Sequence, residues 1–487
     1  MSPARPDRPR DALDADDAST LEPSGPPRPV AAHDEVRGPA LVVAWLEGAP
    51  ELVGAVLRPG REPAILGRGA GDGDERRVTP VRQAPGEEVA LAPPRAPWMS
   101  RRQLRLQALD DTRLLVENLG RAQLRVRGAP CGQAILHADR PGELMTLGDH
   151  ALFVATRRPT RLTTCNHWTR PLQPLGDPDA VGLVGESPAA WALRERVAFV
   201  ARQRGHVLVV GPSGAGKELV AQAMHALSPR AGERLVARNA ATIPHALMDV
   251  ELFGHVANYP NPGMRERPGL VGEADRGTLF LDELGELPEE LQAHLLRVMD
   301  SGEHQRLGDP RSRRVDVRLV AATNRDPESL KPDLRARFRH LVVVPPLDAR
   351  RDDVPLIARH LLRLALHEDP SLGQRLFDGS EPRLDVDLMA ALLVHPLPLQ
   401  VRELEALLWD AIAASTGERV RLGPLLEAGA FEPAGATPPA ELTAEAIAAA
   451  LERHEGHLER VWRDLGLKNR YVLRRLIAKH GLRVPER

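Results

Sequence analysis

Residues 211–218 read GPSGAGKE and combine three glycines with a single lysine. The apolar run VLVV precedes them, and an amphipathic, helix-like stretch follows. In a turn between a strand and a helix, glycines let backbone N–H groups approach phosphate oxygens, and Lys217 can reach the terminal phosphates of a nucleotide. Taken alone, the same residues could form a glycine-rich turn without a ligand. The residues of this stretch that are predicted to bind the cofactor are Gly211, Pro212, Ser213, Gly214, Ala215, Gly216, Lys217 and Glu218.

Two carboxylates, Asp282 and Glu283, end a second apolar run, GTLFLDE. Such a pair can hold Mg²⁺ through water and polarise an attacking water molecule, whereas a buried acidic strand end without a cation would be costly. A third run, VRLVAATN, ends at Asn324, whose amide could sense the γ-phosphate. Because α/β sheets bind ligands at the carboxyl edge of their strands, these groups would meet there. The three motifs predict a site for ATP or another nucleoside triphosphate with Mg²⁺, in which Asp282 is the metal ligand.

The chain of 487 residues is too long for one hydrophobic core, so about three domains are expected. Its 65 Lys and Arg residues nearly balance 67 Asp and Glu residues, which confines any nucleic-acid surface to one region. Cys131 and Cys165 could form one bridge, but no secretory signal is visible, and a reduced, cytoplasmic protein is the simpler hypothesis. No stretch approaches the ~20 apolar residues that a membrane span needs.

Changes of composition divide the first part of the chain into three segments. Residues 1–38 are rich in Pro, Asp and Arg and poor in large apolar side chains, which predicts a disordered tail. Short alternating segments such as RQLRLQAL and AQLRVRG, separated by Gly and Pro, predict an all-β sandwich over 39–159. A polar, Pro-bearing linker is expected over 160–180.

The second part alternates strands with helical patterns over 181–346, which is typical of βαβ units around a parallel sheet. The stretch LPEELQAHLLRVMDSGE predicts one of these helices, with Pro288 in its first turn. No strand is expected in 347–430, which are predicted to form a small helical lid. A Pro/Gly/Ala linker over 431–440 then precedes an all-α segment, 441–487.

Seven motifs together resemble the AAA+ domain of bacterial sigma-54-dependent transcription activators: GPSGAGKE, ELFGH, RPGL, GTLFLDELGELP, LLRVMDSGE, AATNRD and VRELE. The resemblance covers about 181–430. That family also carries glutamate after the phosphate-loop lysine, which accounts for Glu218 where the general motif has Ser or Thr. By motif position, the resemblance implies that Asn239 holds the catalytic Glu283 until nucleotide contact releases it. It also implies that Arg402 of the lid touches the phosphates.

The same family supplies two arginine fingers from a neighbouring subunit in an R-x-D-L-x-x-R pattern. Here KPDLRAR keeps the second finger, Arg337, whereas Lys331 occupies the first position. Lysine lacks the planar fork with which arginine stabilises transition-state charge, so hydrolysis is expected to be slow or differently controlled. Fingers that act between subunits also imply a homo-oligomeric ring, commonly a hexamer.

Between ELFGH and RPGL the family places a loop, Gly-Ala-Phe-Thr-Gly-Ala, that contacts sigma-54. The matching positions here read NYPNPG, residues 258–263, with Pro260 at the Phe position and Asn261 at the Thr position. Two prolines would stiffen this tip, and Tyr259 could offer a substitute aromatic ring one position earlier. The alternative is drift after loss of the sigma-54 contact.

The N-terminal sandwich resembles a forkhead-associated domain, a phosphothreonine-recognition module, through ILGRG, MSRRQL and VENLGRAQLRVRG. Arg68 and Ser100 are suited to bonds with a phosphate, and Arg101 matches the next motif position. The sequence departs from the family at Gln103, where a structural His is usual, and at 123–124, near where Asn-Gly usually sits. A sandwich used for subunit contacts is the alternative.

The C-terminal segment gives two helices, a turn at Gly466 and a basic helix, and it resembles a Fis-type helix-turn-helix. A helix that is merely charged and solvated is the alternative. The residues expected to face a DNA groove and its phosphates are Lys468, Asn469, Arg470, Tyr471, Arg474, Arg475 and Lys479.

The sequence therefore predicts a multidomain chain that consists of an all-β sandwich, an AAA+ α/β ATPase with a helical lid, and an all-α DNA-binding domain. We expect a cytoplasmic regulator that binds promoter or enhancer DNA, hydrolyses ATP, acts on sigma-54 and senses a phosphothreonine protein. One alternative is a regulator, or a partner in a mixed ring, that keeps ATP binding without remodelling sigma-54 polymerase. Another is a signalling adaptor that docks phosphoproteins.

Overall fold

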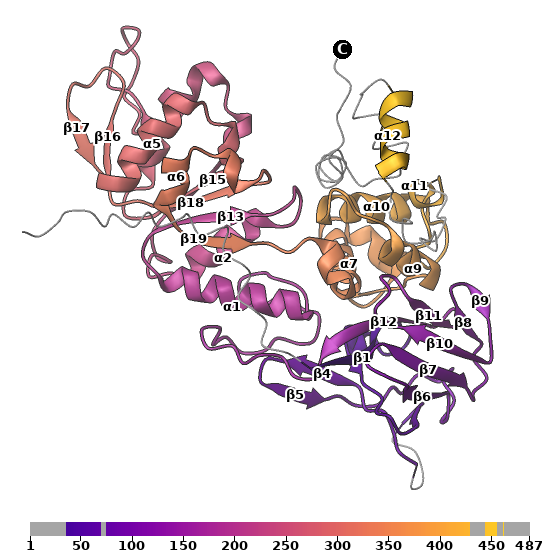
Figure 1. Ribbon diagram of the computed structural model, residues 1–487. Coiled ribbons are helices and arrows are strands. Elements are labelled where there is room, and N and C mark those ends of the chain that lie inside the picture. The colour runs from indigo at the N-terminus through magenta and orange to yellow at the C-terminus, as the bar shows by residue number, and fades with distance from the viewer. Residues whose placement is uncertain (1–35, 70–74, 429–443, 455–460, 462–487) are drawn as a thin grey trace, which may run out of the picture. The chain divides into compact units, whose positions relative to one another are not determined.

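The first part of the described chain forms a β sandwich of two sheets (Figure 1), in which polar and apolar side chains alternate along several strands. The structure is a computed structural model that describes residues 36–69, 75–428, 444–454 and 461, and those from Arg37 onward belong to one compact unit. One sheet has the order β5 (Glu87–Ala90), β4 (Val81–Ala84), β2 (Val56–Leu57), β1 (Arg37–Leu46), β12 (Ala151–Pro159), β11 (Leu144–Leu147), β8 (Leu124–Val126), β9 (Ala129–Pro130). The other has the order β10 (Gln133–His137), β7 (Arg113–Asn118), β6 (Leu104–Ala108), β3 (Ala64–Leu66).

The core of the sandwich follows the two-residue period of its strands. In β6, Leu104 and Leu106 are buried, whereas the intervening Arg105 is half-exposed. These leucines pack in one hydrophobic cluster with Leu41 and Phe153 of the facing sheet. The N-terminal region is therefore β-rich, as predicted.

A parallel sheet forms the centre of the next region, with the order β14 (Leu235–Asn239), β15 (Thr278–Asp282), β18 (Arg318–Thr323), β13 (His206–Val210), β19 (Phe338–Val343). Its three central strands, β15, β18 and β13, are buried on both faces, so successive residues of each strand pack into two different cores. Val207 and Val209 of β13 pack with α1 (Pro188–Arg202) and α2 (Lys217–Ala226). Leu208, between them, packs on the opposite face with α5 (Glu289–Ser301) and α6 (Pro332–Arg337). Figure 1 shows these two helix pairs on opposite sides of the sheet, which confirms the predicted α/β domain.

The helix α5 shows the expected apolar face, with Leu291, Leu295 and Val298 buried. Pro288 is the N-cap residue, one position before the helix, and not in the first turn as predicted. Gly302 ends the helix at φ 72°, a left-handed conformation that glycine adopts without steric cost. Shorter elements of this region are α3 (Met248–Phe253), α4 (Gly269–Glu273) and the hairpin β16 (Glu303–Gln305) with β17 (Ser312–Arg314).

A helical lid follows the parallel sheet. It consists of the 3₁₀ segment Leu347–Asp353 and of α7 (Val354–Glu368), α8 (Gly373–Leu376), α9 (Val386–Val394), α10 (Val401–Ala414) and α11 (Pro424–Ala428). The expectation that no strand occurs in 347–430 is wrong, because β20 (Phe377–Asp378) pairs with β21 (Glu381–Pro382). Each of these strands has two residues, which is too short for an alternation of polar and apolar side chains to be recognised in the sequence.

The described part of the C-terminal segment contains α12 (Ala444–Arg453), in which Ile447 and Leu451 are buried. The other helices predicted for 441–487 lie outside the described residues. Among the described helices, none has the length and apolar character that spanning a bilayer requires.

Candidate functional site

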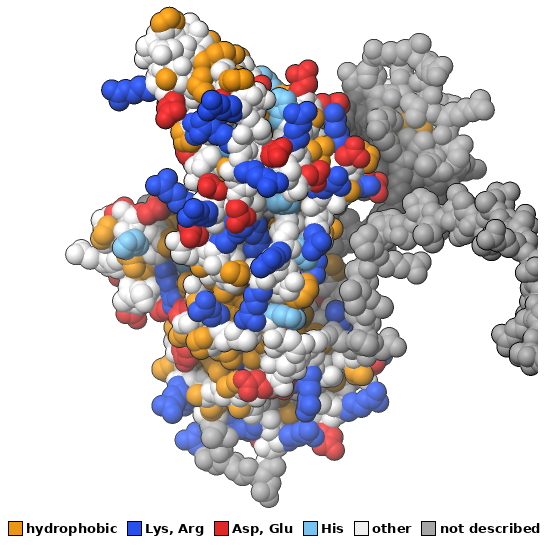
Figure 2. Space-filling model, turned by 90° about the vertical axis from the view of Figure 1, so that its left-hand side faces the viewer, with side chains coloured by type: hydrophobic (Ala, Val, Ile, Leu, Met, Phe, Trp, Pro, Cys, Tyr) orange, Lys and Arg blue, Asp and Glu red, His pale blue; other side chains and the backbone are white. Residues whose placement is uncertain are grey.

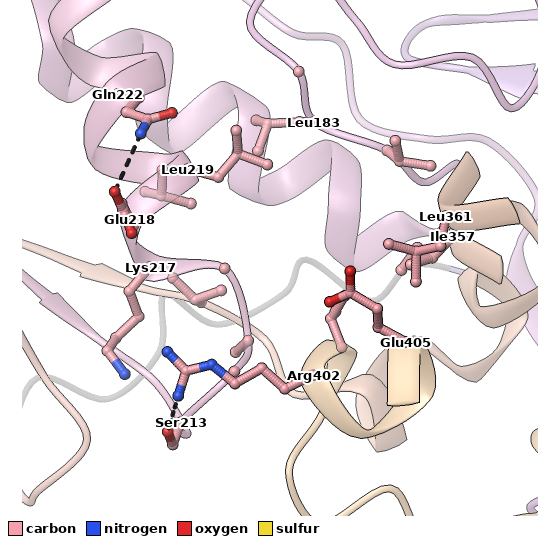
Figure 3. A pocket seen from close by; sticks show the side chains of 18 of the residues that line it. Leu183, Ser213, Lys217, Glu218, Leu219, Gln222, Ile357, Leu361, Arg402 and Glu405 are labelled. Carbon is pink, nitrogen blue, oxygen red and sulfur yellow. Dashed lines mark hydrogen bonds between the residues drawn. The ribbon is translucent and has the colours of Figure 1, made fainter. Parts of the chain in front are cut away.

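A cavity of about 540 Å³ lies at the carboxyl ends of β13 and β15, and the lid forms part of its wall. Figure 3 shows Arg402 reaching from the lid toward Ser213 and Lys217 on the opposite wall. Three sequence motifs and the lid therefore meet around one space. Of the residues predicted for the nucleotide site, those that line it are Ser213, Gly214, Ala215, Gly216, Lys217, Glu218, Asn239, Asp282, Glu283 and Arg402.

Glycine is required in the phosphate loop for steric reasons. Gly214 has φ +80°, and a Cβ there would lie 2.2 Å from the carbonyl oxygen of Leu399 in the lid. Gly216 has φ +99° and is the N-cap of α2, and the first residues of this helix line the cavity. The first backbone N–H groups of a helix have no partner within it and can bind an anion. The loop can thus surround an anion with backbone donors while the lid approaches closely.

Lys217 places a positive charge in the wall of the cavity with only 6% of the residue exposed. Its Nζ donates to the carbonyl oxygens of Gly211 and Pro212 at 3.2 and 3.3 Å. Oε1 of Glu283 is the carboxylate partner, at 3.9 Å, which is a long ion pair. A buried ammonium with such distant compensation fits a strongly anionic ligand such as a polyphosphate.

Asp282 and Glu283 stand together at the end of β15. Glu283 has φ 53° and ψ 49°, a left-handed conformation that is uncommon for residues other than glycine and that clusters at functional sites. Oδ1 of Asp282 accepts the backbone N–H of Glu283 at 3.0 Å. Nδ2 of Asn239 donates to Oδ2 of Asp282 at 3.4 Å. The family resemblance placed this amide on Glu283, and the structure corrects that contact to the neighbouring carboxylate.

The lid contributes Arg402, whose Nη1 donates to Oγ of Ser213 at 3.2 Å. The adjoining wall is apolar and includes Leu183, Ile357 and Leu361. Phosphates suit the charged part of this cavity, and a planar base suits the apolar part. His360 also lines the cavity, and burial lowers its pKa, which favours the neutral imidazole. No sequence motif indicated Ile357, His360 and Leu361 of α7, because the tertiary fold brings them to the cavity.

Five of the residues singled out from the sequence do not line the cavity. Gly211 and Pro212 lie beside it, where their carbonyl oxygens accept from Lys217. Asn324 follows β18, is exposed and does not line the cavity. Arg337 is exposed on α6, where an ion pair and hydrogen bond with Asp300 raise the pKa of its guanidinium. Lys331 precedes the same helix and pairs with Glu289, with Nζ 2.9 Å from Oε2. Neither basic group reaches the nucleotide cavity of its own chain.

The loop 258–263 forms an exposed tip in which Tyr259, Pro260 and Asn261 are all accessible. Oδ1 of Asn258 accepts the backbone N–H of Gly263 at 2.8 Å and closes the loop. The ring of Tyr259 lies against Gly308, where a Cβ would be 2.6 Å from the ring. Tyr259 nevertheless keeps 38% of its surface exposed.

On the face of the molecule in Figure 2, basic and acidic side chains are intermingled.

In the sandwich, Arg68 and Ser100 lie in adjacent loops, because the backbone N–H of Arg68 donates to the Ser100 carbonyl at 3.0 Å. Arg68 and Arg101 are exposed. Gln103 is fully buried, where its Oε1 accepts the Ser100 N–H at 3.1 Å and its Nε2 donates to Oδ1 of Asn118 at 2.9 Å. The Gln103 side chain therefore ties the Ser100 loop to the end of β7.

The residues predicted to contact DNA lie outside the described residues. They are Lys468, Asn469, Arg470, Tyr471, Arg474, Arg475 and Lys479.

Comparison with known proteins identifies relatives of the chain. The family model described as the sigma-54 interaction domain matches residues 183–343. The transcriptional regulatory protein ZraR of Escherichia coli (strain K12) is 37% identical over 308 residues, which cover 61% of this chain and 68% of ZraR. The anaerobic nitric oxide reductase transcription regulator NorR of Salmonella heidelberg (strain SL476) is 42% identical over 274 residues, or 53% of this chain and 52% of NorR.

Among solved structures, NtrX from Brucella abortus in complex with ATP is 30% identical, with a TM-score of 0.45 over 62% of this chain and 69% of NtrX. The residues that match the sigma-54 interaction domain, 183–343, span the strands of the parallel sheet and the phosphate loop. The chain belongs to the family of sigma-54-dependent AAA+ transcriptional regulators.

Proposed function

We propose that this protein is a DNA-bound, cytoplasmic regulator that hydrolyses ATP to act on sigma-54-dependent transcription. The observation that carries the proposal is the meeting of Lys217, Asp282, Glu283 and Arg402 around one cavity. These groups can bind phosphates from opposite walls and place carboxylates beside them. The apolar wall formed by α7 and its neighbours supports a nucleotide in preference to inorganic phosphate.

In the proposed reaction, Lys217 and the backbone N–H groups of the phosphate loop hold the β- and γ-phosphates. Glu283 orients and polarises the attacking water, and Arg402 moves with the lid to hold the phosphate end. Mg²⁺, when bound, would supply positive charge that offsets the negative charge of the phosphates. The described residues contain no group of three or more His, Cys, Asp or Glu side chains that could hold a metal ion. Asp282, water and the phosphates would therefore be its ligands, as Mg²⁺ commonly prefers.

Arg337 and Lys331 are the proposed fingers of a homo-oligomeric ring, with a hexamer as the expected size. Both lie away from the nucleotide cavity of their own chain, which supports a role at the cavity of a neighbour. The exposed tip at Tyr259 is the proposed contact with sigma-54. The altered residues Pro260 and Asn261 favour a second candidate, in which the ring regulates transcription without that contact.

The two ends supply the other proposed contacts. Arg68, Ser100 and Arg101 are the proposed phosphothreonine site, supported by the adjacency of their loops and by the bridging Gln103. The C-terminal helix-turn-helix is the proposed DNA contact, and its basic sequence supports it.

Replacing Lys217 with Ala should abolish ATP binding, because the buried positive charge of the phosphate loop is lost. Glu283→Gln should keep ATP affinity and lower hydrolysis by about 100-fold or more, since it removes the base but keeps the shape. Calorimetry measures the first effect and phosphate release measures the second. Unchanged nucleotide affinity in Lys217→Ala would refute the assignment of the phosphate loop.

Lys331→Arg should raise the ATPase rate of the assembled protein, by at least about tenfold, because a planar guanidinium stabilises transition-state charge better than an ammonium. The control is Arg335→Lys, an exchange at an exposed position of α6, the helix that follows Lys331. Steady-state rates should be compared at concentrations at which rings form. Equal rates for the wild type and Lys331→Arg would exclude Lys331 from the transition state.

Arg68→Ala should weaken binding of a phosphothreonine peptide library by about tenfold or more, because a hydrogen bond to a charged group is lost. The matched control is Arg61→Ala, at an exposed position before β3, the strand that Arg68 follows. The proposal of phosphate sensing fails if wild-type protein binds phosphorylated and plain peptides with equal affinity.

Removal of residues from Pro439 onward should abolish sequence-specific promoter binding and leave ATP binding intact. Electrophoretic mobility shifts at several salt concentrations would measure the loss, because phosphate contacts depend strongly on salt. Sequence-specific binding that survives the truncation would place the DNA contact elsewhere.

A further inference from the structure

A buried arginine of the sandwich contacts the segment that leads into the lid. Arg158, in β12, is only 2% exposed and forms an ion pair with Asp352 of the 3₁₀ segment Leu347–Asp353. Its Nη1 also donates to the carbonyl oxygen of Glu186 at 3.2 Å, just before α1. One guanidinium therefore joins the sandwich to two elements of the ATPase region.

A second buried ion pair strengthens this junction. Arg82, in β4, donates from Nη2 and Nε to the two carboxylate oxygens of Glu186, at 2.6 and 3.3 Å. The Arg82 and Glu186 side chains are 10% and 7% exposed. Buried charges that are paired in this two-bonded geometry are costly to separate, so the relative position of the two elements is strongly held.

The residues next to these partners reach the phosphate loop. Asp353 is fully buried and accepts the backbone N–H groups of Glu186 and Ser187 at 2.7 and 2.8 Å, which fixes the start of α1. Arg350, in the same 3₁₀ segment, lines the nucleotide cavity and donates from Nη2 to the carbonyl oxygen of Ala215 at 3.2 Å. The segment thus touches the sandwich through one residue and the phosphate loop through another.

The helix α7 continues this double contact. A Cβ at Gly54 of the sandwich would lie 3.0 Å from the Leu356 side chain. The backbone of the sandwich and the side chain of Leu356 in α7 are therefore closely packed. Leu356 also shares a hydrophobic cluster with Trp45 and Val154 of the sandwich. The next residue, Ile357, lines the nucleotide cavity, as does His360 one turn later. Movement of the sandwich would therefore move the apolar wall of the cavity.

We propose that Arg158 is a positioning residue of the nucleotide site, which acts through Asp352 on the Arg350 contact and on α7. The sandwich is then part of the apparatus that shapes the ATP pocket, and not only a module for binding partners. This inference rests on the proposed binding of ATP. It also implies that a ligand of the sandwich that shifts β12 changes nucleotide affinity, and that nucleotide changes the affinity for that ligand by the same factor.

The test compares Arg158→Ala with Arg157→Ala, its exposed neighbour on the same strand, in the full chain. Arg158→Ala should raise the Kd for a fluorescent ATP analogue about tenfold, and Arg157→Ala should leave it unchanged. Asp352→Asn, which keeps the shape of the side chain, should reproduce the loss. Adding Arg158→Ala to Asp352→Asn should cause a smaller loss than Arg158→Ala causes in the wild type, because the ion pair is already broken and the bond to the Glu186 carbonyl is the part still to be lost.

Hydrogen exchange without nucleotide separates this inference from the proposed function. Arg158→Ala should speed exchange of backbone amides in 347–361 and in the phosphate loop, whether or not the protein binds ATP. Circular dichroism would show that the variants are folded. Wild-type nucleotide affinity and unchanged exchange in folded Arg158→Ala and Asp352→Asn would overturn the proposal. Absence of nucleotide binding by the wild type, with faster exchange in Arg158→Ala, would instead refute the proposed function and leave the positioning contact supported.

Discussion

The nucleotide site depends on one interaction, the attraction between the buried ammonium of Lys217 and an anionic ligand. A positive charge with 6% exposure and a carboxylate 3.9 Å away needs an anion to complete its surroundings. The phosphate loop can bend around such an anion because Gly214 and Gly216 adopt positive φ angles. The same absence of a Cβ at Gly214 lets the lid come within contact distance of the loop. The phosphate loop therefore supplies both the positive charge that binds an anion and the glycine that lets the lid backbone approach.

Local sequence patterns were enough to predict the phosphate-binding part of the site. The phosphate loop and the carboxylates after β15 are contiguous motifs, and the two-residue and helical periods indicated the β-rich region and the α/β domain. The contacts that depend on tertiary packing could not be read in this way. His360 and Arg350 line the cavity from segments without a recognised motif, and Asn239 bonds to Asp282 and not to Glu283. Asn324 follows its strand as expected, but its exposed position puts it outside the cavity wall.

A buried polar side chain organises one end of the sandwich. The amide of Gln103 has both a donor and an acceptor, and it bridges Ser100 to Asn118. At the tip, Pro260 and Asn261 change the exposed surface without entering a core. Exposed loops tolerate such changes because few packed contacts depend on them. The nucleotide frame can therefore persist while the surface offered to a partner changes.

That separation leaves the partner of the tip as the central question, because Tyr259 is still exposed beside the altered residues. The most direct measurement is capture of purified sigma-54 by the full-length protein with ADP and aluminium fluoride bound, compared with nucleotide-free protein. If the protein drives sigma-54-dependent transcription through the tip, sigma-54 is captured with the analogue, and Tyr259→Ala reduces the capture. Measurable ATP hydrolysis without capture of sigma-54 would contradict the account.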